Sequence, residues 1–100
     1  MENERTGELI LLRGKINQID AQLLPLFLSR MQVSAEVADY KRRAGIPVRD
    51  EAREEELLAR IGAQAGDMDQ YAQALYREIL SLSRAYQEKL LGRDGEAQAK

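Results

Sequence analysis

The chemistry open to this chain is limited first by two residue types that it lacks. Its 100 residues include no histidine and no cysteine. This excludes disulfides, thiolate or imidazole metal sites, and any catalytic triad that needs either residue. A general base that titrates near neutral pH is also hard to supply without histidine. Any catalysis must therefore work through lysine, arginine, carboxylates, hydroxyls and amides.

Two cations lie on what should be the buried face of the first helical segment. At about 100° per residue, Arg30 and Lys41 each fall within roughly 20° of Leu23, and Ser34 shares their sector. Cations on such a stripe are costly unless an opposite charge meets them. They either reach solvent or pair with a carboxylate such as Glu54, which is the commoner case, or they form a buried anion site. The pattern alone leaves both readings open.

Four residues of the last segment also share one helical face. Tyr76, Leu80, Ser83 and Gln87 are spaced four, three and four residues apart. The Ser83 hydroxyl and the Gln87 amide can donate and accept hydrogen bonds. They either lie at a solvated edge or complete a polar cavity between helices, and the sequence favours neither reading.

Other charged candidates have ordinary explanations as well as functional ones. Arg13 points about 80° away from Leu23, as a surface arginine would, although in a dimer it could reach the partner's site. Asp50 is a good N-cap, and Arg53 and Glu54 follow in the first helical turn, where acidic residues favour the helix dipole. The short loop 46–50 brings these residues close to the end of the first segment.

Helical periodicity without strand alternation predicts an all-α fold. Glycine, proline and aspartate mark the bounds of three helical blocks: about 6–43 (stopped at Gly45 and Pro47), 50–64 (capped by Asp50) and 67–91 (after a break at Gly66, capped by Asp67 or Asp69, stopped at Gly92). We expect one domain over residues 1–92 and a polar tail over residues 93–100.

The first block is too long for a compact domain of this size. A helix of about 38 residues spans roughly 57 Å, whereas such a domain has a radius of gyration of about 13 Å. The overhanging apolar stripe needs a partner, which predicts an obligate homodimer with the long helices packed together. Pro25 costs a helix about 3 kcal/mol, but periodicity on both sides of it favours a kink over a break.

Composition narrows the class of partner and compartment. With 15 basic and 17 acidic residues the net charge is −2, which argues against nucleic acid as the main partner. The chain has no apolar run long enough for a membrane span, and its first residues do not resemble a signal peptide. The cytoplasm is the expected compartment.

The ordered set of these residues resembles the AroQ-type, all-helical chorismate mutases over about residues 8–92. The matching positions are Leu12-Arg13-Gly14-Lys15-Ile16 with Asp20, then Arg30, Val37 and Lys41, then Pro47-Val48-Arg49-Asp50 with Arg53-Glu54, and finally Ser83 and Gln87. The resemblance implies an intertwined homodimer of three-helix chains, in which each site is completed by one arginine from the other chain.

The resemblance also assigns roles to single residues. Arg13 would be the donated arginine and would share the substrate carboxylates with Arg30, supported by Ser83. Lys41 and Gln87 would hydrogen-bond the ether oxygen. The ring end with its hydroxyl would be held by Arg53, Glu54 and the Asp50 backbone, and Val37 would pack on the ring.

The implied reaction suits a chain without histidine or cysteine. Chorismate rearranges to prephenate, in phenylalanine and tyrosine biosynthesis, by a pericyclic bond exchange that needs no nucleophile, metal or other cofactor. Holding the compact conformer and placing fixed donors around the ether oxygen would accelerate it. Two alternatives are an isochorismate-pyruvate lyase of the same fold and a non-catalytic dimerisation or regulatory module of a larger enzyme. The segment 47–54 favours the mutase over the lyase.

Overall fold

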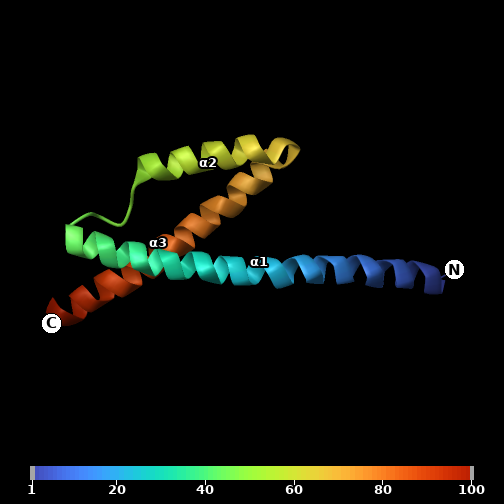
Figure 1. The fold of residues 1–100 in the computed structure, drawn as a ribbon, viewed down its shortest axis with the longest axis horizontal. Helices are drawn as coiled ribbons and strands as arrows, with labels where there is room; N and C mark the ends of the chain where they lie inside the picture. Colours follow the sequence, from blue (N-terminus) through green and yellow to red (C-terminus); the bar gives the residue numbers. More distant parts are fainter. Residues whose placement is uncertain (1, 100) are drawn as a thin grey trace. The chain divides into compact units, whose positions relative to one another are not determined.

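The computed structural model describes the backbone of residues 2–99 and the side chains of residues 6–92. Its elements are α1 (Glu2–Ala44), α2 (Glu51–Ala65), the 3-10 turn η1 (Gly66–Met68) and α3 (Asp69–Ala99) (Figure 1). No strand occurs in that range, so the predicted all-helical class is confirmed. The chain divides into two compact units, residues 1–32 and residues 33–100, which are described separately below.

The first helix is uninterrupted over 43 residues, with Pro25 inside it. The expected continuity through this proline is therefore confirmed, and the helix begins slightly earlier than the predicted residue 6. Proline removes one backbone donor and crowds the preceding turn. The long helical segments on either side supply enough hydrogen bonds to keep the helix continuous across that defect.

The end of α1 is set by Gly45, as the sequence predicts. Gly45 has φ +70°, a left-handed conformation that disfavours residues with a Cβ. Behind it, the Ile46 N–H donates to the Lys41 carbonyl over 2.9 Å and the Gly45 N–H donates to the Arg42 carbonyl over 3.4 Å. These are the two bonds of a Schellman motif, and they satisfy carbonyls that the helix end would leave without partners.

The second helix starts as predicted, but the junction after it differs. The Asp50 carboxylate accepts from the Arg53 N–H over 3.0 Å and caps α2. At the predicted break, Gly66 has φ +58°, yet a single 3-10 turn carries the chain directly into α3. The Asp69 carboxylate accepts from the Gln73 side chain. The described helical structure therefore forms two stretches, 2–44 and 51–99, and the expected second break is wrong.

The third helix also continues beyond its predicted end. It runs through Gly92 to Ala99, because Gly92 does not adopt the positive φ that ends a helix. A glycine that stays helical costs only about 1 kcal/mol relative to alanine. Of the predicted polar tail, residues 93–100, the side chains and the whole of Lys100 lie outside the described part of the chain.

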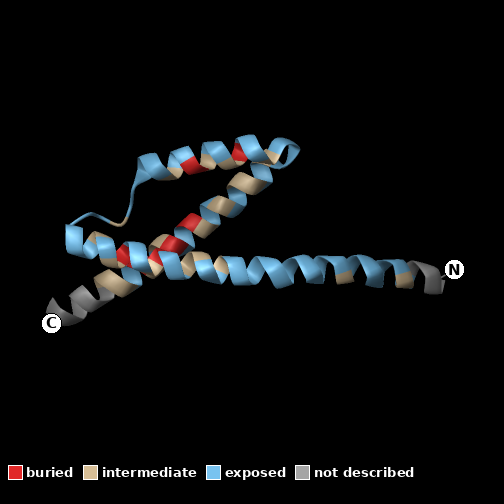
Figure 2. Cartoon of the chain, viewed as in Figure 1, coloured by how far each residue is buried: buried red, intermediate tan, exposed pale blue. Residues whose placement is uncertain are grey.

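The unit of residues 33–100 contains the buried residues of the described chain. Helices α2 and α3 fold back on each other, and the red segments of Figure 2 mark buried positions on α2, α3 and the last part of α1. The buried set consists of a small apolar group and a polar group: Ala38, Leu57 and Leu80, with Ser34, Ser83 and Gln87. A core this small, with half of its members polar, is unusual and marks the place where a functional site should be sought.

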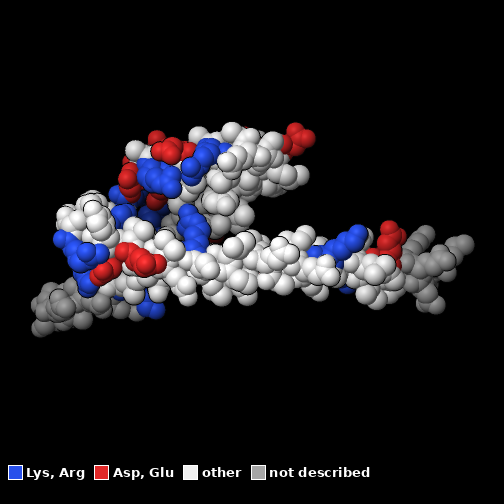
Figure 3. Space-filling model, in the orientation of Figure 1, with Lys and Arg blue, Asp and Glu red and all other residues white. Residues whose placement is uncertain are grey.

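The unit of residues 1–32 has a different surface. Its large aliphatic side chains are exposed, from Leu9 at 45% to Leu11 at 70%. The space-filling view shows few charges along the middle of α1 (Figure 3). Within the described residues, no helix has a stretch sufficiently long and apolar to traverse a bilayer.

Exchanging glycine for alanine at two positions tests these helix ends. Gly45→Ala should lower the free energy of unfolding by about 1 kcal/mol, because alanine must adopt a left-handed conformation there. Gly92→Ala should raise it by up to about 1 kcal/mol, because alanine is the better helix former. Urea unfolding at one protein concentration measures both, and a stabilising Gly45→Ala would contradict the Schellman assignment.

Candidate functional site

A buried cluster of three neutral polar side chains joins α1 to α3 within the unit of residues 33–100. Ser34 lies on α1, and Ser83 and Gln87 lie one turn apart on α3; their exposed fractions are 6%, 7% and 7%. The two serine hydroxyls hydrogen-bond each other. The Gln87 Nε2 amide donates to Ser34 Oγ over 3.0 Å and to Ser83 Oγ over 3.3 Å. The sequence placed Ser83 and Gln87 on one face, and the structure shows that this face is buried.

The cluster leaves one polar atom without a partner. Among the described residues, Gln87 Oε1 is buried and accepts no hydrogen bond. Rotating the amide by half a turn would let the serine hydroxyls donate to Oε1 and would put the NH₂ group in the unpartnered position. In either orientation one hydrogen-bonding position of Gln87 is left over. Since an unsatisfied buried group costs about 1–3 kcal/mol, this position is suited to a bound polar atom.

Lys41 is half-buried near the end of α1, but it is not paired with a carboxylate as the commoner reading expected. Its Nζ donates to the Val48 carbonyl over 2.6 Å, across the loop that leads to α2. No ion pair joins it to any acidic side chain that the structure describes. An ammonium group has further N–H donors after one such bond, so Lys41 retains capacity to bind an anionic or ether oxygen.

The neighbouring cations of α1 are engaged at the surface. Arg42 and Arg43 both hydrogen-bond Asp39, and these bonds hold the pKa of the Asp39 carboxyl below its usual range. The pairs are exposed and contribute little to stability. Of the three basic residues in the last turn of α1, Lys41 is thus the one that is part-buried.

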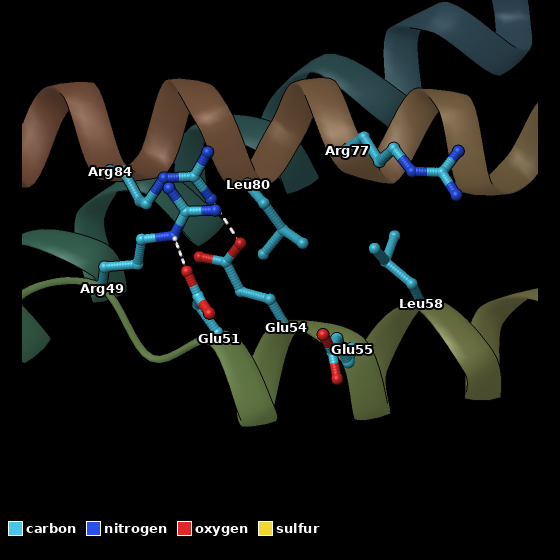
Figure 4. Close-up of a pocket in the computed structure, with 8 residues that line it drawn as sticks. All are labelled: Arg49, Glu51, Glu54, Glu55, Leu58, Arg77, Leu80 and Arg84. Carbon is cyan, nitrogen blue, oxygen red and sulfur yellow. Dashed lines mark hydrogen bonds and ion pairs between the residues drawn. The ribbon is translucent and has the colours of Figure 1, made fainter.

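The start of α2 separates its two predicted site residues. Arg53 is exposed and lies 3.6 Å from Glu56, as a solvated arginine would. Glu54 is only 18% exposed, and its Oε1 accepts from Arg84 of α3, which is 27% exposed. Figure 4 shows the Arg84 and Glu54 side chains pointing toward each other. Asp50 is exposed and serves as the α2 cap described above.

The remaining candidates do not join these residues in a single chain. Arg13 is exposed and Arg30 is half-buried, both in the unit of residues 1–32. Val37, in the other unit, has 38% of its surface exposed. The structure therefore brings together Ser83 and Gln87, leaves Lys41 and Glu54 part-buried on neighbouring elements, and gives Arg13 no buried role within its own chain.

Sequence reasoning missed two partners of the site residues. Ser34 was recognised on the inward stripe, but its bond to Gln87 was not predicted. Arg84 was not singled out at all. Its signal was weak: it follows Ser83 directly, so about 100° of helix rotation separates the two side chains, and it carries the charge that Glu54 lacks nearby in sequence.

The chemistry that these groups can perform is binding and electrostatic stabilisation. A buried amide and hydroxyls, a part-buried ammonium and a fixed carboxylate can orient a polar anion and stabilise charge that develops on an oxygen. Within the described residues, no group of acidic side chains is arranged to hold a metal ion.

Comparison with known proteins gives one family. The family model described as chorismate mutase type II matches residues 12–88. A protein named T-protein from Enterobacter agglomerans is 40% identical over 53 residues, 53% of this chain and 14% of that protein. A chorismate mutase from Methanocaldococcus jannaschii is 38% identical over 50 residues, half of each chain. The chain thus aligns with half or less of these relatives, and no solved structure matches it.

The buried cluster predicts a stability effect. Ser34→Ala removes both hydrogen bonds of Ser34 Oγ and leaves Gln87 with one partner fewer, so the free energy of unfolding should fall by about 1–3 kcal/mol. Ser81→Ala, at an exposed position of the same helix as Gln87, is the matched control and should change it by no more than about 0.5 kcal/mol. Equal effects of the two substitutions in urea unfolding would refute the importance of the cluster.

Proposed function

Because the chain belongs to the chorismate mutase type II family, we propose that it is a chorismate mutase, which rearranges chorismate to prephenate. The observation that carries the proposal is the buried Gln87 amide, which Ser34 and Ser83 hold in place while one of its polar atoms lacks a partner. Such a neutral, fixed donor suits an ether oxygen on which negative charge develops during the reaction.

Gln87 and Lys41 would act together on the ether oxygen. With its amide rotated, Gln87 would accept from the serine hydroxyls and donate through Nε2 to that oxygen. Lys41, fixed through the Val48 carbonyl, would add a positive charge. Both groups are in place before the substrate binds, so little reorganisation is needed as the C–O bond breaks and the new C–C bond forms. The proposed reaction uses no protein nucleophile and no cofactor.

The other candidates would hold the substrate in its compact conformer. Arg30 and the Arg13 of a second chain would bind the two carboxylates, with Ser83 supporting one of them. Glu54, Arg53 and the Asp50 backbone would hold the hydroxyl-bearing end of the ring. Val37, exposed in the single chain, would pack against the ring face.

The proposal includes a homodimer. The exposed aliphatic residues of α1 between Leu9 and Leu28 would otherwise remain in water, at about 25 cal/mol for each Å² of apolar surface. A second copy of the same helix would cover them and would bring its Arg13 to the site. In this arrangement an exposed arginine of one chain becomes a substrate ligand of the other.

Loss of either proposed ether-oxygen donor should abolish most of the activity. The native chain should convert chorismate to prephenate, and Lys41→Ala or Gln87→Ala should each lower kcat by about 10²- to 10³-fold, the usual effect of removing one such donor. Lys89→Ala and Gln70→Ala change the same residue types at exposed positions outside the site and should leave kcat within about 2-fold of native.

Two results would overturn the proposed function in different ways. Pyruvate release from isochorismate, without prephenate formation from chorismate, would indicate the lyase. No turnover of either substrate by the folded native chain would indicate a non-catalytic module.

Mixing two inactive variants tests the shared site. In a mixed dimer of Arg13→Ala and Arg30→Ala chains, one site would combine both native arginines and the other would lack both. Refolding equal amounts together should therefore restore about one quarter of native activity, since half of randomly paired dimers are mixed. No recovery would place both arginines in the same chain. A mass of one 11.3 kDa chain in solution at micromolar concentration would refute the dimer itself.

A further inference from the structure

We propose that Arg84 is a positioning residue, which fixes the Glu54 carboxylate so that its second oxygen can bind the ring hydroxyl of the substrate. The assignment rests on the proposed function. Glu54 Oε1 accepts from Arg84 Nη1, and the two side chains are 18% and 27% exposed. Among the described residues this is the least exposed ion pair, and it joins α2 to α3.

The pair lies in a cavity of about 380 Å³ between α2 and α3, a volume in the range of small-molecule sites. Two other arginines line this cavity, but they have different partners. Arg49 lies 3.5 Å from Glu51, and Arg77 donates to Gln73 over 3.3 Å. Figure 4 shows Arg84 as the cation directed at Glu54, with the Leu80 and Leu58 side chains beside the pair.

A carboxylate in a part-buried position needs such a partner. Without Arg84, the Glu54 charge would lose a charge-assisted hydrogen bond in a place where water replaces it incompletely. The carboxylate could then turn toward solvent. With Arg84, one oxygen is fixed by a planar guanidinium and the other remains available to accept from a hydroxyl. Arg84 would thus contribute to substrate binding without contacting the substrate.

The position of Arg84 couples two parts of the proposed site. It follows Ser83 directly on α3, so the helix that presents Ser83 and Gln87 also presents the cation that orients Glu54. A displacement of α3 would then disturb the ether-oxygen donors and the ring-hydroxyl acceptor together. An alternative is that the pair only clamps α2 to α3, and the experiment below separates the two roles.

A double-mutant cycle on the native full chain tests the coupling. Arg84→Met should raise KM for chorismate about 10-fold and lower kcat less than about 3-fold, since it removes binding shared by substrate and transition state. In the Glu54→Gln background the same Arg84→Met change should alter KM less than about 2-fold, because its target is gone. Arg77→Met, which removes another arginine of the same cavity, should leave both constants within about 2-fold of native.

A merely structural clamp would give a different pattern. Loss of folded sites lowers the apparent kcat without changing KM, and it would do so equally with and without Glu54, so either result would overturn the proposal. Arg84→Lys keeps the charge but not the planar fork. It should give a KM between those of native and Arg84→Met, which provides a readout if Arg84→Met folds poorly. An active native chain with unchanged Arg84 variants refutes this inference alone, whereas an inactive native chain refutes the proposed function as well.

Discussion

The structure around the site depends on one constraint, which is that the buried Gln87 amide must find hydrogen-bond partners. A primary amide has two N–H donors and a carbonyl acceptor, and each is costly to bury alone. Gln87 obtains partners from Ser34 on α1 and from Ser83 one turn earlier on α3. Because these serines lie on different helices, the bonds fix the register of α3 against the last part of α1. The unpartnered Oε1 is the part of this requirement that the protein alone does not meet.

Burial and charge are distributed around this cluster in a consistent order. The most buried polar groups are neutral, at 6–7% exposure, where an unpaired charge would be very costly. The charged groups are less buried and each has a fixed partner, the Val48 carbonyl for Lys41 and Arg84 for Glu54. A site built in this way holds its dipoles and charges in place before a ligand arrives, which is what electrostatic stabilisation requires.

Local sequence signals predicted the features that local forces determine. The left-handed Gly45, the Asp50 cap, the continuous α1 and the shared face of Ser83 and Gln87 follow from backbone sterics, capping and helical periodicity. The 3-10 junction at Gly66 and the helical Gly92 were missed, because glycine permits a break without requiring one. The bonds from Ser34 to Gln87 and from Arg84 to Glu54 were missed for another reason. Periodicity gives the face of a residue, whereas these pairs depend on the rotation of one helix against another.

The unit of residues 1–32 shows why a single chain is an incomplete description of this sequence. A helix gains most of its stability in a protein from packing an apolar face, yet Leu11, Leu23 and Leu26 are each more than half exposed here. Pro25 adds a further cost of about 3 kcal/mol in the same stretch. Neither cost is offset within the unit, so a continuous helix of this composition requires apolar surface from elsewhere. A second copy would supply it in a form that matches by symmetry, and the same contact would give exposed Arg13 a role that its own chain does not provide.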